Sequence, residues 1–166
     1  MFRKPLLALL CVTLLLPLVS QADDDREEHQ RSQKRAPPPH FKPYTTECGS
    51  CHLAFPPSLL PARSWTALLS GLTDHFGQNA EVDAATRKQL EAWLVQNAGR
   101  DVPGPTPLRI TTLRWWRSEH DELSPATFRR KSVLSPANCG ACHPGANEGA
   151  FGEHEVKVPP DAPAAR

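Results

Sequence analysis

The 166-residue chain has little net charge, few long apolar runs and one methionine, Met1. Its 19 lysines and arginines against 18 aspartates and glutamates give no support for nucleic-acid binding. No segment shows the alternation expected of β-strands. The 18 prolines interrupt the apolar runs, which makes a large core difficult to build. We therefore expect an all-α protein that is small and contains much loop.

The longest apolar run lies at the N-terminus. Arg3 and Lys4 precede the run from Leu6 to Val19, and Ser20-Gln21-Ala22 supplies small residues for cleavage. This pattern predicts a signal peptide over residues 1–22, cleaved after Ala22, and a periplasmic protein. About 14 apolar residues interrupted by proline are too few to span a bilayer. The mature chain is therefore expected not to span a membrane, to contain no methionine and to keep four of the five cysteines.

Composition and spacing divide the rest of the chain. Residues 23–40 predict a disordered charged, proline-rich arm, and residues 153–166 a disordered tail. Between them we expect two lobes, 41–102 and 103–152, separated at the loop of residues 99–107, which is dense in helix breakers. Apolar spacing predicts helices over roughly 62–76 and 108–122, and another capped by Asp83. Short helical segments are expected around 45–52, and after Ser124 and Ser135, which each precede a proline.

Each lobe carries the same short motif, C-x-x-C-H. Cys48, Cys51 and His52 form the first copy, and the second consists of Cys139, Cys142 and His143. Cysteines three residues apart lie on one face of a helical turn, where each can form a thioether with a haem vinyl group. The following histidine is then placed to bind the iron, and this spacing is the signature of c-type haem attachment. Two copies predict two covalently bound haems.

Other chemistry explains these residues less completely. A zinc site made of two C-x-x-C pairs usually has a gap of about 15–20 residues, whereas 87 residues separate Cys51 from Cys139. Disulfides suit an exported protein, but they leave both histidines unexplained. A thioredoxin-like redox pair would need a βαβ context, which the sequence lacks.

The sixth ligand of each iron must come from another residue. Methionine, a common choice, is absent after export, which leaves His29, His40, His75, His120 and His154. His75 lies 23 residues after His52, and His120 lies 23 residues before His143. We therefore predict His75 and His120 as distal ligands, each paired within its own lobe because this requires no chain crossing. His40 stays open as an alternative for the first iron.

Further side chains are candidates to surround the haems. Six aromatic residues are candidates for the pocket walls, although plain core packing predicts the same burial: Phe55, Trp65, Phe76, Trp93, Trp115 and Trp116. Six cations are candidates to pair with propionates, although most surface cations are only solvated: Arg63, Arg114, Arg117, Arg129, Arg130 and Lys131.

The sequence from about Tyr44 to Gly152 resembles the bacterial di-haem cytochrome c family of exported electron carriers. The blocks that carry the resemblance are "ECGSCHLAFPPSLLPARSW", "LTDHFGQNA", "EAWLVQNA", "RITTLRWWRSEHDEL" and "SPANCGACHPGANEGAF". The resemblance implies covalent attachment at the four motif cysteines, and bis-histidine ligation with His52 and His143 proximal and His75 and His120 distal. It also implies a redox partner, either a monohaem oxygen-binding cytochrome c or a membrane cytochrome b. The arm at 23–40 is not part of the family pattern.

These residues favour one function over two others. Irons with both axial positions filled by imidazole leave no place for a substrate, so we expect a non-enzymatic carrier that transfers single electrons. A di-haem enzyme, either a peroxidase or a small-molecule reductase, needs an open iron, and so does a redox or gas sensor. Carbon monoxide distinguishes these functions, because it binds a ferrous iron only where a coordination position is free.

Overall fold

The computed structural model describes residues 41–160, and these form helices joined by long loops. The α-helices are α2 (Lys42–Cys48), α3 (Ala62–Ser70), α4 (Ala84–Gln96), α5 (Arg114–Ser118) and α6 (Pro125–Phe128). Short 3-10 helices lie between them, and residues 41–160 contain no β-strand beyond two isolated bridges. The predicted all-α fold is confirmed. The predicted signal peptide and the whole predicted arm, with His29 and His40, lie outside the described residues.

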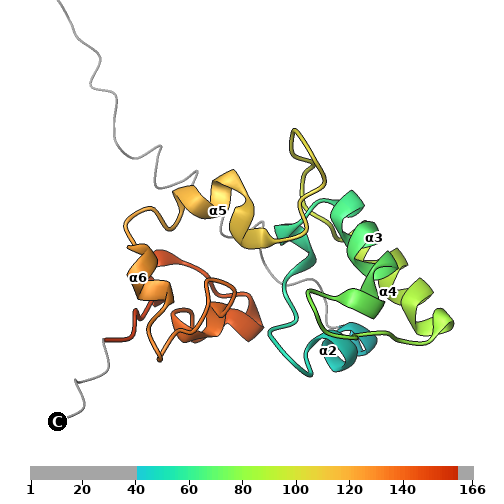
Figure 1. The fold of residues 1–166 in the computed structure, drawn as a ribbon, viewed down its shortest axis with the longest axis horizontal. Helices are drawn as coiled ribbons and strands as arrows, with labels where there is room; N and C mark the ends of the chain where they lie inside the picture. The colour runs from blue at the N-terminus through green and yellow to red at the C-terminus, as the bar shows by residue number, and fades with distance from the viewer. Residues whose placement is uncertain (1–40, 161–166) are drawn as a thin grey trace, which may run out of the picture.

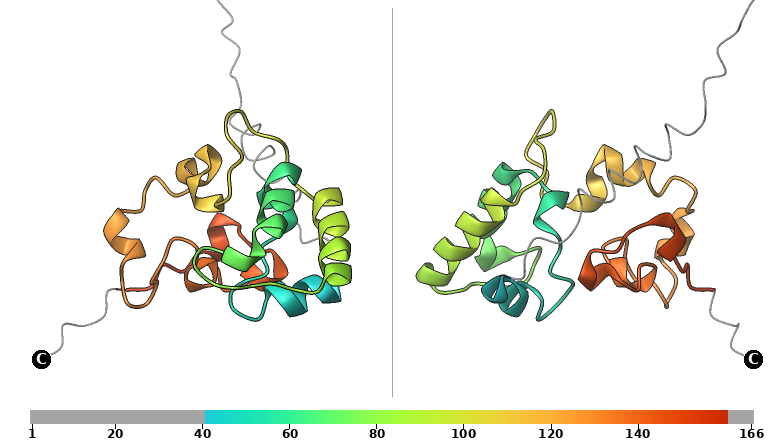
Figure 2. Two further views of the ribbon diagram at one scale, coloured as in Figure 1. Left: turned by 45° about the vertical axis from the view of Figure 1, so that its right-hand side comes forward. Right: turned by 180° about the vertical axis from the view of Figure 1, so that it is seen from behind.

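The chain forms two groups of elements, with α5 between them (Figure 1). Helices α2, α3 and α4 form one group, and α6 with the loops after it forms the other, as the view from behind in Figure 2 also shows. Within residues 41–160, no helix is both long enough and apolar enough to cross a membrane.

The first group has a continuous apolar core. Helices α3 and α4 pack together through Leu69, Leu90 and Leu94, which are all buried. Tyr44 of α2 joins them, and its ring lies edge-on to Trp65 at a centroid distance of 6.4 Å. Leu113 belongs to the same cluster. Because Leu113 follows the predicted boundary at 102/103, its contact joins the two parts of the chain.

Two hydrogen bonds hold the loop that follows the first C-x-x-C-H motif. The hydroxyl of Tyr44 donates to the carbonyl of Phe55 at 2.6 Å, and the indole N–H of Trp65 donates to the carbonyl of Pro57 at 2.8 Å. The other end of the loop lies against Gly99, whose N–H donates to the carbonyl of Leu60. A Cβ at Gly99 would collide with the carbonyl of Ser58, so only glycine fits there. The loop is therefore fixed from several sides.

The α4 N-terminus agrees with its sequence signal, whereas α3 is shorter than expected. Asp83 caps α4, since its carboxylate accepts hydrogen bonds from the N–H groups of Ala85 and Thr86. Helix α3 ends at Ser70 rather than near Phe76, with Gly71 after it. The chain continues as the 3-10 helix η2 (Leu72–Asp74) and then turns at His75. The predicted helix over 62–76 is therefore too long at its C-terminal end.

The predicted helix over 108–122 is broken into two pieces. The 3-10 helix η3 (Ile110–Thr112) comes first, and α5 begins after Leu113, whose backbone is extended. Before η3, the loop of residues 99–107 projects from the molecule (Figure 1). Arg63 holds this loop by donating to the Asp101 carboxylate at 2.6 Å and to the carbonyl of Val102 at 2.6 Å. Arg63, which the sequence offered as a candidate partner for a haem propionate, therefore holds the loop of residues 99–107.

The C-terminal part consists of short turns. Within residues 117–160 only Thr127, Val133, Cys142 and Ala146 are buried. Helix α6 begins at Pro125 as expected, but the segment of the second motif is a single 3-10 turn, η4 (Cys139–Ala141), rather than an α-helix. Further 3-10 turns, η5 (Ala146–Glu148) and η6 (Glu153–Glu155), follow it. This part of the chain therefore has little protein core of its own.

Candidate haem sites

The first motif lies where α2 ends. Cys48 is the last residue of α2, and Gly49 caps it by donating its N–H to the carbonyl of Thr45. A Cβ at Gly49 would overlap the same carbonyl. Glycine at this position therefore lets the backbone pass close to the last turn of α2 as the chain leaves the helix. Cys51 and His52 follow in an exposed turn instead of the helix that was expected. The cysteine pair is therefore presented by a helix end and the turn after it.

His52 and His75 face one another in the first site. Their ring centroids are 6.2 Å apart and their planes differ by 22°. Nδ1 of His52 lies 2.6 Å from the carbonyl oxygen of Leu53, and Phe55 stacks on the same ring at 5.0 Å. A hydrogen bond from Nδ1 to the carbonyl leaves Nε2 as the nitrogen available to a metal.

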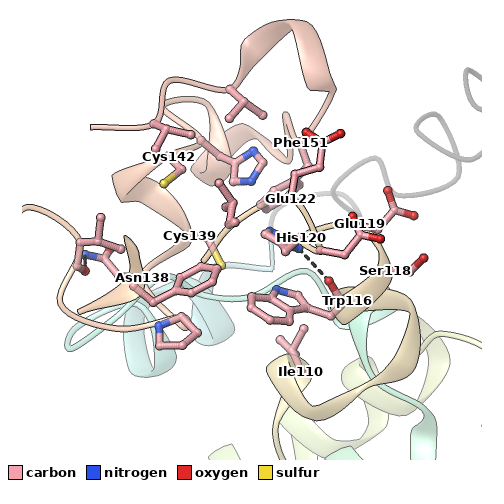
Figure 3. A pocket seen from close by; sticks show the side chains of 18 of the residues that line it. Ile110, Trp116, Ser118, Glu119, His120, Glu122, Asn138, Cys139, Cys142 and Phe151 are labelled. Atoms are coloured by element: carbon pink, nitrogen blue, oxygen red, sulfur yellow. Dashed lines mark hydrogen bonds between the residues drawn. The ribbon is translucent and has the colours of Figure 1, made fainter. Parts of the chain in front are cut away.

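His120 and His143 form a corresponding pair in the second site. Their ring centroids are also 6.2 Å apart, but their planes differ by 71°. Nδ1 of His120 lies 2.8 Å from the carbonyl oxygen of Trp116, and the two rings stack at 4.2 Å (Figure 3). Nδ1 of His143 is buried and has no hydrogen-bond partner in the described protein. A buried polar ring atom without a partner fits a site that is completed by another group.

The ring separation tests whether an iron fits between each pair. Metal–imidazole bonds are about 2 Å long, which places two rings on opposite sides of one ion about 6 Å apart, centre to centre. Both histidine pairs are 6.2 Å apart, whereas Trp116 and His120, which touch directly, are 4.2 Å apart. Both pairs therefore fit a metal between two imidazoles.

A cavity of about 500 Å³ lies in the second site. Cys139, Cys142, His120 and His143 line it together with Trp116 (Figure 3). Its other walls are largely apolar and include residues that precede and follow the motif: Ile110, Leu123, Phe128, Val133, Pro136, Phe151, Val156 and Val158. The volume lies in the range of about 300–1,000 Å³ typical of cofactor pockets. The cavity thus brings both cysteines, both histidines and an apolar wall to one place, as a haem requires.

The four motif thiols are free, and the environment makes three of them poor nucleophiles. Burial raises the pKa of Cys48 to about 11, with a smaller contribution from the nearby charge of Glu47. Burial also raises the pKa of Cys139 and of Cys142. Redox-active cysteines have a lowered pKa, so these thiols do not resemble a thioredoxin-like pair. Within residues 41–160, no three histidine, cysteine, aspartate or glutamate side chains converge as a zinc site would require.

The surroundings favour neutral imidazoles, the form that binds metal. Burial lowers the pKa of His75, and the neighbouring His52 and Arg109 lower it further. Burial and His120 likewise lower the pKa of His143, while Glu155 opposes this shift. Histidine ligands are therefore available in each site near neutral pH.

Other candidate residues have different positions. His154 is exposed in η6 and is not among the residues that line the cavity of the second site. Phe76, which was expected to wall a haem pocket, is 45% exposed and carries the guanidinium of Arg109 over its ring at 3.9 Å. Sequence reasoning missed Arg109, because it lies far along the chain from Phe76 and no local pattern marks the contact.

Two C-x-x-C-H motifs in a helical, loop-rich chain, each beside a pair of facing histidines, define a c-type cytochrome with two haems. Residues 44–151 match the sequence model of the dihaem cytochrome c family, and the chain belongs to this family. A comparison with curated proteins returns no match.

Solved structures of dihaem cytochromes c are similar to this chain. One from Rhodobacter sphaeroides is 45% identical, with a TM-score of 0.62, and the match covers 67% of this chain and 96% of that one. A second structure from the same organism is 44% identical, with a TM-score of 0.61, over 68% and 98% of the two chains. One from Shewanella baltica OS155 is 37% identical, with a TM-score of 0.67, over 75% and 97%. The predicted family and its two c-type haems are confirmed, and the family supports a haem-based role in electron transfer.

Proposed function

We propose that the protein is a bis-histidine electron carrier of the periplasm. Cys48 and Cys51 hold the first haem, with His52 as proximal and His75 as distal ligand. Cys139 and Cys142 hold the second, with His143 proximal and His120 distal. One observation carries this proposal: both histidine pairs have a separation of 6.2 Å, which is the spacing that one metal ion requires.

The chain's residues explain why such sites transfer electrons without other chemistry. Each haem supplies a one-electron ferric/ferrous couple when bound. Carbonyl groups of Leu53 and Trp116 accept hydrogen bonds from His52 and His120, which fixes the rings and makes them stronger ligands. Ligation by two histidines should give lower potentials than ligation by histidine and methionine, because methionine raises the potential.

Location and partner follow from sequence features. The signal-peptide pattern of residues 1–22 supports export to the periplasm, where c-type cytochromes of this family are expected. The family resemblance supports another redox protein as the partner, either a monohaem oxygen-binding cytochrome c or a membrane cytochrome b. Near-neutral composition offers no support for a nucleic-acid partner.

Carbon monoxide tests the proposal directly. The reduced wild-type protein should keep its absorption spectrum immediately after mixing with carbon monoxide, since no iron has a free position until a distal histidine leaves. His75→Ala and His120→Ala should each make half of the haem reactive, whereas His154→Ala, a matched change at an exposed histidine, should not.

The outcomes separate this function from its alternatives. A wild-type iron that binds carbon monoxide at once would contradict the carrier and favour a di-haem enzyme or a gas sensor. If His40→Ala opens the first iron and His75→Ala does not, the first distal ligand is His40. If the His75 and His120 variants each open the iron of the other motif, the ligand pairing is crossed.

A further inference from the structure

The ring of His75 lies at the start of a tight turn. The backbone N–H of His75 donates to the carbonyl of Gln78 at 2.7 Å, and the backbone N–H of Gln78 donates to the carbonyl of His75 at 3.3 Å. The two residues between them, Phe76 and Gly77, have φ angles of 57° and 92°. Positive φ at both central positions is the property of a type I′ turn, where asparagine and glycine are preferred. The turn therefore fixes the backbone from which the side chain of His75 projects.

Phe76 is an unfavourable residue for its position. A bulky side chain at positive φ is strained, and the ring is also 45% exposed. Neither feature benefits the turn itself. Strain of this kind is typical of functional positions, where surrounding contacts maintain it. The contacts of the Phe76 ring must therefore account for a phenylalanine at this strained position.

The ring of Phe76 contacts both His75, the proposed ligand, and Arg109. Its centroid lies 4.8 Å from that of His75, and the guanidinium carbon of Arg109 lies 3.9 Å above its face. Arg109 immediately precedes η3, which leads through α5 toward His120. The contact thus connects the turn of the first site to the segment that carries the distal histidine of the second. The guanidinium is close enough to contribute to the lowered pKa of His75.

We propose that Arg109 and Phe76 form a positioning pair that holds the His75 turn in place for the first iron. The proposal rests on the proposed function, because it requires His75 to be the distal ligand. Arg109 holds the outer face of Phe76, which reduces the freedom of the turn and keeps His75 within reach of the iron. Its positive charge beside the first site also favours the ferrous state there, since reduction removes one positive charge.

Two substitutions remove the Arg109–Phe76 contact without disrupting the turn from His75 to Gln78. Phe76→Asn removes the ring but suits positive φ, so the turn should form at least as well as before. Arg109→Gln removes the charge and keeps a long side chain. In reduced protein, carbon monoxide can bind the first haem only after His75 leaves, so the rate of this phase at saturating carbon monoxide reports release of His75. Each variant should raise this rate by about two- to five-fold, the change expected when an exposed cation–π contact is lost.

Controls make the result specific to the pair. Arg87→Gln, at an exposed arginine of α4, should leave the rate unchanged. Arg109→Lys keeps a cation and should restore most of the wild-type behaviour. In the double variant, the two changes should not multiply, because both remove the same contact. Arg109→Gln should also lower the potential of the first haem, identified by the spectrum of His75→Ala, while the second haem stays unchanged.

The possible failures can be told apart. Rapid carbon monoxide binding by the wild type would overturn the proposed function before the pair is tested. A closed wild type whose rate is unaffected by Phe76→Asn and Arg109→Gln would overturn the positioning pair and leave the carrier intact. Rates that multiply in the double variant would show that the two residues act separately, which also contradicts the pair.

Discussion

The two histidine pairs have the same separation but different orientations. The planes of His52 and His75 differ by 22°, and those of His120 and His143 by 71°. Nearly parallel imidazoles donate to the same iron d orbital, which separates its energy from that of the neighbouring orbital. Crossed imidazoles donate to both, so the two orbitals stay close in energy. The proposed ligand sets are therefore electronically different.

This difference predicts two distinct signals from the oxidised protein. Low-temperature electron paramagnetic resonance should show one rhombic low-spin signal from the first haem and one strongly axial low-spin signal from the second. His75→Ala should remove the rhombic signal and His120→Ala the axial one. Two identical signals in the wild type would contradict the ring orientations.

Leu134 provides a stability prediction at the same scale. Its φ angle is 73°, and its side chain is 73% exposed, so it has backbone strain without the benefit of burial. The carbonyl of Arg130 accepts the N–H of Leu134 at 2.8 Å, and turns that close in this way usually place glycine at the left-handed position. Leu134→Gly should raise the free energy of unfolding by about 1 kcal/mol.

Chemical denaturation of the holoprotein measures this change. Leu108→Gly is the matched control, because Leu108 is also exposed but is not among the residues with positive φ. There the greater freedom of glycine in the unfolded chain should lower stability. Equal effects of the two substitutions would show that the backbone at Leu134 is not strained.

At the scale of elements, apolar spacing located the helices better than it located their ends. Apolar spacing and the Asp83 cap correctly predicted α4. Helix α3 is shorter than expected because Gly71 ends it and His75 is required at a turn. The segment over 108–122 breaks at Leu113, which leaves the helix to enter the first core. Contacts distant in sequence decide such breaks, and a local pattern does not contain them.

The α4 cap has a pH dependence whose sign follows from the pKa of Asp83. Hydrogen bonds from Thr86 and Ala85 lower this pKa below its ordinary value of 3.8. Because the folded pKa is the lower one, the carboxylate's contribution to stability is complete above about pH 4 to 5, and is lost as the pH falls through the folded pKa. Thermal unfolding of the wild type should therefore show this loss between pH 4 and strongly acidic conditions, as a rough window.

Asp83→Asn tests the assignment, because asparagine is also a good N-cap but does not titrate in this range. The variant should be less dependent on pH below about 4 and close to the wild type at neutral pH. Asp74→Asn is a suitable comparison, since Asp74 accepts one hydrogen bond from Gly77 but caps no long helix. A wild-type slope that persists in Asp83→Asn would assign the acid sensitivity to other carboxylates.

At the scale of the whole molecule, the chemistry of the sites was more predictable than their surroundings. The cysteine spacing predicted the four cysteines and the two proximal histidines. The lack of methionine and the 23-residue spacing favoured His75 and His120 as distal ligands, with His40 left open. The structure adds the ring separations, on which the proposed local pairing rests. The Arg109–Phe76 contact joins residues 33 positions apart. No motif encodes it, because it depends on how two loops meet in the fold.

Buried side chains are distributed unevenly between the two parts of the chain. Residues 41–116 contain the apolar cluster around Leu69, Leu90 and Leu94, whereas residues 117–160 bury only four side chains. A cofactor that binds only the native chain stabilises it, and the second part depends more on such support. A haem-free variant with all four motif cysteines changed to alanine should therefore be largely unfolded, with residual helix confined to α3 and α4.

Circular dichroism and amide hydrogen exchange would test this expectation on the full chain. Helix content should fall strongly, and any protected amides should lie around Leu90 and Leu94, with none around Val133 or Ala146. Changing only Cys139 and Cys142 to alanine is the informative intermediate. It should keep the first haem and its helices while the second part loses protection. Protection of residues 117–160 in that variant would contradict this expectation and show that this part folds without haem. Its small core would then suffice, because Leu113 and Trp116 attach it to the first core.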